Sequence, residues 1–254
     1  MPNDNSLCRN ARYLKVTYDP RRCPLNEYPY LLAQYLARSA FGPPGRLLDL
    51  GCGRGDHLAA FAAHGFDVVG VDLSVSDLGY RTIVADLEED EISRESGEVD
   101  YVFSKSVIEH LRNPHRLLES AFKTLRPGGR AVIMTPSWEH NYWGPFYVDH
   151  THVTPFTACS LATALEIAGF EGIQVTYFHQ LPFVWKYPVL AVIPALLRRL
   201  PVPYRPFRPA PWPEAVNKLI RFSKEVMLLG TAVKPLGGVG EGSSARAVPA
   251  NSDI

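Results

Sequence analysis

The sequence predicts an α/β fold: a doubly wound, seven-stranded, mostly parallel sheet with helices on both faces and an antiparallel last strand. Three observations lead to this prediction. Short apolar runs alternate with helical stretches from residue 46 to residue 136, a glycine-rich turn follows the first run, and an acidic residue lies at or near the end of the first three runs. Such alternation is typical of βαβ units, which build parallel sheets.

The elements follow from local patterns. A helix is expected at 28–41, where Tyr, Leu and Ala recur at helical spacing until a Gly-Pro-Pro-Gly turn stops it. A second helix is expected at 161–168, closed by Gly169. The expected strands are 47–50, 67–71, 82–85, 99–103, 130–134, 172–178 and 225–232.

The chain is expected to divide into three parts. Residues 1–45 form an N-terminal segment with its helix, residues 46–236 form one α/β domain, and residues 237–254 form a flexible tail rich in Gly, Ser and Ala. Within the domain, 181–213 is a hydrophobic, proline-rich insertion with nine prolines, interleaved with aromatic residues. We interpret it as a lid over the carboxyl edge of the sheet. The alternative is a peripheral membrane contact through 183–200, since its apolar run is shorter than the roughly 20 residues of a membrane span.

Composition narrows the function classes. Lys plus Arg and Asp plus Glu number 26 each, so no net field favours nucleic acid as a partner. The four cysteines are far apart and form no CxxC pair, which disfavours a zinc site or a disulfide framework. The first 11 residues lack the apolar region of a secretory signal, and we expect a cytoplasmic protein.

The chemistry-bearing motif is LLDLGCGRGD at 47–56. Gly51, Gly53 and Gly55 let the backbone approach a nucleotide closely, because side chains there would occupy the ligand's space. The third glycine of a dinucleotide fingerprint would come one position later, where Asp56 stands. An acid at that helix start repels a pyrophosphate but not a phosphate-free nucleoside.

Acidic residues at or near three strand ends support the interpretation of this glycine-rich turn as a nucleotide-binding site. Asp72 ends the second strand, 19 residues beyond Gly53, the distance at which a carboxylate reaches ribose hydroxyls. Asp86 follows the third strand, where it can accept a bond from the adenine amine while Leu73 and Leu87 flank the ring. Together with Asp49, these two acids are expected to lie beside one crevice at the edge of the sheet. Three acids that merely capped unrelated turns would not be expected to meet there.

With these motifs in order, residues 47–136 resemble the class I methyltransferases, particularly small-molecule enzymes such as the ubiquinone-biosynthesis O-methyltransferases. The resemblance rests on the glycine motif, GVDLS at 70–74, ADL at 85–87, VIEHL at 107–111 and LRPGGR at 125–130. It implies a Rossmann-like fold and S-adenosyl-L-methionine (SAM) as cofactor. It also implies that the three glycines wrap the methionine part, Asp72 holds ribose, Asp86 and Leu87 hold adenine, and Ser104 and Lys105 lie against the cofactor.

Departures from related families refine the prediction. Amino-directed nucleic-acid methyltransferases place an Asn or Asp with two prolines and an aromatic residue after strand four, whereas this chain has SKSV at 104–107. Some quinone methyltransferases are thought to use acids around the Glu-His pair for a metal. Here Ser106 stands where a further acid would be expected, so we predict no required metal.

A hydroxyl acceptor needs a base, and the loop YVDHTHVTPF at 147–156 offers His150 and His152, with Asp149 to orient a ring. A structural hydrogen-bonding role for either His is the competing interpretation. Tyr142, Trp143 and Tyr147 suit a flat or apolar small-molecule acceptor.

The expected function is methyl transfer to such an acceptor, most readily at oxygen. Transfer to nitrogen or carbon, a non-catalytic SAM-binding module and an NAD-dependent oxidoreductase are the alternatives. The glycine spacing, Asp56 and the lack of a Tyr-x-x-x-Lys pair disfavour the oxidoreductase.

Overall fold

Seven strands form one mixed sheet in the computed structural model, which describes residues 26–76, 78–142, 145–202 and 212–237. Their order is β3-β2-β1-β4-β5-β7-β6, and β7 runs antiparallel to both of its neighbours, β5 and β6. This confirms the predicted fold class. The strands are β1 Arg46–Leu50, β2 Asp67–Asp72, β3 Thr82–Val84, β4 Val99–Lys105, β5 Leu125–Pro136, β6 Glu171–Phe178 and β7 Met227–Val233.

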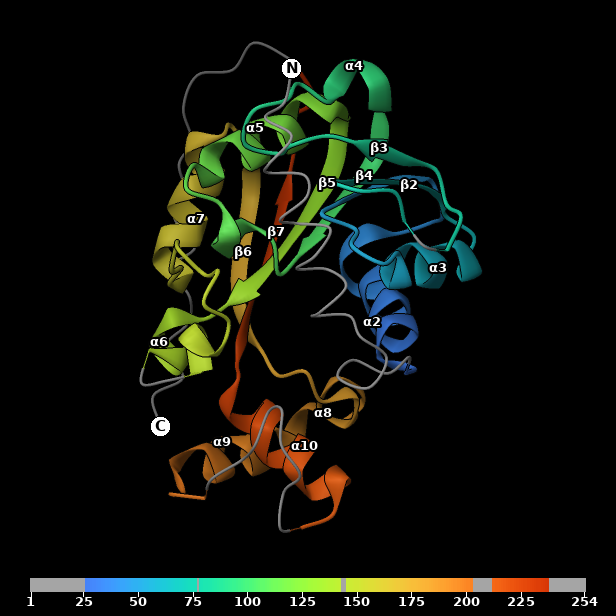
Figure 1. The fold of residues 1–254 in the computed structure, drawn as a ribbon. Helices are drawn as coiled ribbons and strands as arrows, with labels where there is room; N and C mark the ends of the chain where they lie inside the picture. The colour runs from blue at the N-terminus through green and yellow to red at the C-terminus, as the bar shows by residue number, and fades with distance from the viewer. Residues whose placement is uncertain (1–25, 77, 143–144, 203–211, 238–254) are drawn as a thin grey trace.

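Helices cover both faces of the sheet (Figure 1). The longer ones are α2 Tyr28–Leu36, α3 Asp56–Ala63, α5 Pro114–Thr124, α7 Ala158–Ile167, α9 Val192–Arg199 and α10 Glu214–Lys224. Shorter turns of helix are η1 Ala37–Phe41, α4 Ser93–Ser96, η2 Ile108–His110, α6 Trp138–Asn141, η3 Pro145–Val148, α8 Pro182–Lys186 and η4 Pro188–Ala191. The expected helix at 28–41 is therefore α2 continued by η1.

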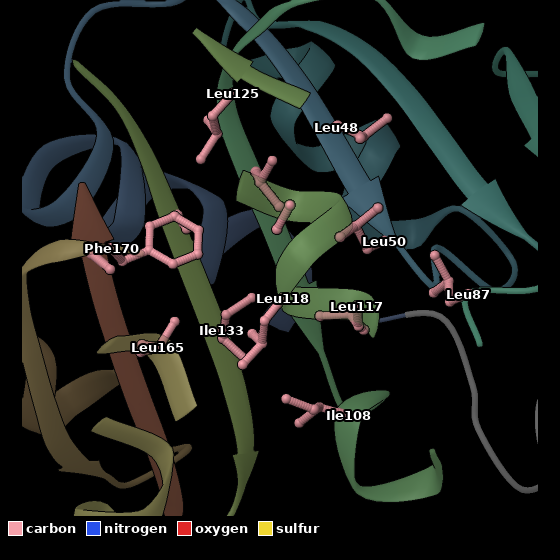
Figure 2. Close-up of a cluster of buried hydrophobic side chains, with 14 of the residues drawn as sticks. Leu48, Leu50, Leu87, Ile108, Leu117, Leu118, Leu125, Ile133, Leu165 and Phe170 are labelled. Carbon is pink, nitrogen blue, oxygen red and sulfur yellow. The ribbon is translucent and has the colours of Figure 1, made fainter. Parts of the chain in front are cut away.

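The strands at the centre of the sheet are rich in apolar residues because both of their faces are buried. In β1, Leu48 and Leu50 belong to the core under α5 and α7, whereas Leu47 belongs to the core under α2 and α3. Figure 2 shows the first of these cores, in which side chains from the strands meet Leu117 and Leu118 of α5. The two cores fix the sheet, and hence the loops at its carboxyl edge.

The described part of the segment before the last strand lies below the carboxyl ends of the parallel strands, and residues 203–211 of the predicted 181–213 lid lie outside the described residues (Figure 1). Its described part comprises α8, η4 and α9, and α10 packs beside α9 before the chain enters β7. The sequence pattern predicted no helix at 214–224. In α10 the buried positions include Ile220 and Ser223, which are too few to stand out after a proline-rich run.

Other differences concern element ends. β5 begins at Leu125 rather than 130, because Leu125 already pairs with Val99 of β4. α7 begins at Ala158, three residues earlier than expected, because Thr157 and Ser160 cap its first turn reciprocally. Within the described residues, no helix has the length and apolar character needed to cross a membrane.

Candidate functional site

The glycine-rich turn joins β1 to α3 at the carboxyl edge of the sheet. Gly51, Gly53 and Gly55 all have positive φ angles, of 79°, 54° and 93°, which favour glycine over any other residue. At Gly51 a Cβ atom would also lie 2.3 Å from Cγ2 of Val107, so the turn has no room for a side chain there. The sequence therefore specifies a bare backbone at this point of the edge.

Asp72, at the end of β2, is bound to that turn. Its Oδ2 accepts a hydrogen bond from the Gly53 amide at 2.8 Å, and its Oδ1 accepts one from the Leu73 amide at 2.8 Å. Burial raises the pKa of this carboxyl, and the backbone amides oppose the rise. The carboxylate is thus held beside the glycines at the position predicted for ribose recognition.

Asp49 is a buried acid, 2% exposed, at the penultimate position of β1. Its Oδ2 has no hydrogen-bond partner among the described residues. Burial, and then the nearby charge of Asp72, raise the pKa of Asp49 to about 8, while Lys105 lowers it. A buried carboxylate oxygen without a partner is costly, and a cationic ligand group such as an ammonium would satisfy it.

Two further residues join this region that sequence analysis missed, His57 of α3 and Tyr28 of α2. The His57 Nε2 and the Tyr28 hydroxyl are buried and lack partners among the described residues. Lys105 lies near both residues. Its Nζ is 5.7 Å from the centre of the Tyr28 ring. Burial lowers the pKa of His57 to about 3, and the charge of Lys105 is a second, smaller cause of that shift. Neither residue carries a motif signal, since α2 precedes the motifs at 47–136 and His57 lies in an ordinary helical turn.

The remaining predicted cofactor residues fall on two sides of the edge. Asp86 and Leu87 directly follow β3; Asp86 Oδ1 accepts a bond from the Glu88 amide at 2.9 Å, and Leu87 is buried. Ser104 is buried within β4, and its hydroxyl donates to the Leu50 carbonyl at 2.9 Å. Ser104 therefore ties β4 to the end of β1, and its hydroxyl is already engaged within the sheet.

A second polar group forms where η2 meets the loop after β5. Glu109 is fully buried; its Oε2 accepts a bond from the Thr135 hydroxyl at 2.9 Å, and its Oε1 has no hydrogen-bond partner among the described residues. Oε1 lies 3.9 Å from Nε2 of His152. Burial raises the pKa of Glu109 to about 7 despite the Thr135 bond and the charge of Lys105.

The two histidines of this group are held by their Nδ1 atoms. His152 Nδ1 lies 2.6 Å from the Phe146 carbonyl, and His110 Nδ1 lies 2.8 Å from the Thr151 hydroxyl, which itself donates to Asp149 Oδ1 at 2.6 Å. The rings meet edge to face with centres 4.6 Å apart. Burial lowers the pKa of both, that of His110 to about 4.

Ligand atoms of Glu109, His110 and His152 all lie within 4.8 Å of one another, so this group has the composition of a site for a divalent cation. Glu109 and His110 are adjacent in the sequence motif, but no local pattern predicted that His152 joins them. The amides of Val153 and Thr154 both donate to the Glu109 carbonyl, at 2.9 and 3.0 Å, and these bonds place the loop there.

The remaining residues predicted for catalysis and acceptor binding lie outside the Glu109 group. His150 is exposed and lies outside the Glu109 group. Tyr142 and Tyr147 are 61% and 57% exposed, and Trp143 lies outside the described residues. Trp138, which sequence analysis did not name, has its ring centre 6.3 Å from that of Tyr142 and 6.1 Å from that of Tyr147.

Comparison with known proteins places the chain in a family. A family model described as a methyltransferase domain matches residues 25–175. A ubiquinone biosynthesis O-methyltransferase from Psychrobacter arcticus is 29% identical over 184 residues, 62% of this chain and 72% of that protein. One from Aromatoleum aromaticum is 30% identical over 123 residues, 44% of this chain and 53% of the relative.

Solved structures share the fold at lower identity. A SAM-dependent methyltransferase from Archaeoglobus fulgidus has a TM-score of 0.53 and 20% identity, covering 81% of this chain and 94% of the other. The 1,6-didemethyltoxoflavin-N1-methyltransferase of Burkholderia thailandensis, solved with its substrate and S-adenosylhomocysteine, has a TM-score of 0.57 and 18% identity, covering 92% and 91%. These likenesses concern the fold.

Proposed function

The chain belongs to the SAM-dependent methyltransferase-domain family, and we propose that it transfers the methyl group to an oxygen atom of a small, apolar, hydroxylated acceptor. One observation carries the choice of oxygen: the buried Glu109 carboxyl faces Nε2 of His152 at 3.9 Å. A hydroxyl acceptor must lose its proton, and this pair can take it.

The hydrogen bonds of His152 fix its tautomer. The Phe146 carbonyl can only accept, so the proton of the neutral ring resides on Nδ1, and Nε2 carries the lone pair. Burial lowers the pKa of His152, which keeps the ring neutral near pH 7. His152, rather than the exposed His150, is therefore the proposed base.

Glu109 would stabilise the ring once Nε2 has taken a proton. Its Oε1 has no partner among the described residues, and the imidazolium would supply one. Because burial raises the pKa of Glu109 to about 7, the carboxyl is ionised mainly above neutrality. The pair would thus work best at slightly alkaline pH.

Cofactor recognition is proposed to use the residues of the glycine-rich edge. Asp49 offers an unpartnered carboxylate oxygen to the ammonium group of SAM, Asp72 faces the ribose, and Gly51 leaves room for the methionine part. When bound, SAM supplies a methyl carbon activated by its sulfonium, so the protein has mainly to align the acceptor and exclude water. Asp86 and Leu87 complete the proposed set at the adenine end.

The acceptor is proposed to be apolar because aromatic rings surround Trp138. Its ring lies 5.2 Å from Phe146, edge to face, and near the exposed rings of Tyr142 and Tyr147. Flat apolar molecules bind well against such rings. The relatives named for ubiquinone biosynthesis are O-methyltransferases, which supports the same choice.

The direct test is methyl transfer from radiolabelled SAM to paired acceptors that differ only in the receiving atom, such as a catechol with an alkyl chain and the aniline in which amino groups replace both hydroxyls. We expect the catechol to be methylated and the aniline to be methylated at least about 100-fold more slowly. Preferential methylation of the aniline would contradict transfer to oxygen and favour the N-methyltransferase alternative.

We also propose that no metal is required, although the Glu109 group has the ligand types for one. Turnover of chelator-treated protein should match that of untreated protein. A loss restored by a divalent cation would assign the group to metal binding instead.

A further inference from the structure

The helical insertion at the carboxyl edge carries an exposed apolar stripe. Val189, Val192 and Leu196 are 81%, 55% and 56% exposed, and Ile193 and Leu200 extend the same row. Their spacing of three and four residues places them on one side of η4 and α9. We call these five residues the apolar face of α9.

This face is not the inner side of the helix. Pro194 is buried and Leu190 and Leu197 are half-buried, at the complementary helical positions where α9 meets α10. Lys224 of α10 also donates to the Leu200 carbonyl at 2.7 Å, which fixes the end of α9. The helix is therefore already packed on one side, and its apolar face is turned outward.

Charge is distributed unevenly around this face. The sequence from residue 172 to residue 213 contains no Asp or Glu, in a chain that has 26 acids and 26 bases in all. The same stretch has five basic residues, Lys186, Arg198, Arg199, Arg205 and Arg208. Among the described residues of this stretch, Lys186 and Arg199 are exposed bases close in sequence to the apolar face. An apolar face with basic neighbours is complementary to an anionic surface.

We propose that the apolar face of α9 docks onto an anionic lipid bilayer. The exposed side chains would enter the boundary between headgroups and acyl chains, while Lys186 and Arg199, both exposed, would contact lipid phosphates. Since no described helix can span a membrane, the contact is peripheral. The helix α9 itself lies on the side of the sheet where the parallel strands have their carboxyl ends (Figure 1).

Co-sedimentation of the full-length protein with vesicles tests this proposal. Vesicles of phosphatidylcholine with about 30% phosphatidylglycerol should bind the protein at low salt, and pure phosphatidylcholine should bind it at least about tenfold more weakly. The double variant V192E/L196E should lose at least about tenfold in partitioning to anionic vesicles. Arg199→Gln should lose about fivefold.

The matched control is Ile167→Glu, which changes an equally exposed aliphatic residue, 69% exposed, at the end of α7. It should bind vesicles as the unaltered protein does, and unchanged SAM affinity in every variant would show that the fold is intact. Retained vesicle binding by V192E/L196E would overturn the proposal, as would equal binding to neutral vesicles. A concentration-dependent dimer that V192E/L196E abolishes, without vesicle binding, would overturn it in favour of a second copy of the chain.

Discussion

The two halves of the candidate site are built in different ways. On the cofactor side, Gly51, Gly53 and Asp72 lie at or just beyond the ends of neighbouring parallel strands, and one backbone bond joins Gly53 to Asp72. On the acceptor side, Glu109 and His152 come from loops 43 residues apart in the chain. Several long-range hydrogen bonds hold those loops together.

The two halves also differ in charge. The proposed cofactor side presents the buried Asp49 and the half-buried Asp72, two carboxyls whose pKa values burial raises, with Lys105 near Asp49. The acceptor side presents neutral histidines around one buried carboxyl. The first arrangement suits a cationic ligand and the second suits proton transfer, so changes in each half should affect different measurements.

The largest effect is expected from Asp72→Ala. Loss of a carboxylate that would bind ribose and that holds the glycine turn should weaken SAM binding at least about 100-fold in calorimetric titration. The matched control is Asp67→Ala, at the other end of β2, where the side chain is 78% exposed. Normal SAM affinity in Asp72→Ala would contradict the assignment of the cofactor side.

A comparable effect, on turnover instead of binding, is expected from His152→Ala. Removing the proposed base should lower kcat about 100-fold while SAM affinity stays unchanged. His115→Ala, at an exposed position of α5, should leave both unchanged. His150→Ala should cost much less than His152→Ala; equal turnover in His152→Ala and the unaltered protein would remove the base hypothesis.

The dependence of kcat and Tm on pH tests the role proposed for Glu109 on the acceptor side. Its pKa rises from 4.5 to about 7 on folding, so kcat should increase as pH rises through 7 and this inflection should vanish in Glu109→Gln. The free energy of unfolding should instead decrease as pH rises through the same range. A carboxyl with a raised folded pKa stabilises the protein below pH 4.5, and that stabilisation is lost as pH approaches 7. The Tm of the unaltered protein should therefore fall over this range relative to that of Glu109→Gln.

The smallest effect is expected from Tyr28→Phe. Its hydroxyl is buried and has no partner among the described residues, so its removal should leave the Tm without SAM unchanged or raised. If the hydroxyl binds the cofactor, SAM affinity should fall about fivefold. Tyr30→Phe, on the same helix and 46% exposed, is the control that should change neither quantity.

Local sequence was sufficient for much of the fold. The strands β1, β2 and β4 were predicted within two residues of their ends, because buried parallel strands are short apolar runs between turns. The bounds of β5 and α7 were less accurate, since strand pairing and a side-chain cap set them. The helix α10 was missed because much of its surface is polar, and only packing beside α9 gives it a buried side.

The sequence by itself determined that Gly53 and Asp72 meet at the proposed cofactor side, because glycines and strand-end acids within a βαβ unit are brought together by the geometry of adjacent parallel strands. Tertiary structure decided the acceptor side. It joined His152 to Glu109 and made Trp138 the centre of the aromatic group. It also added Tyr28 and His57 to the buried polar set near Lys105. The physical reason is that these contacts depend on how loops cross the sheet edge, which no local spacing encodes.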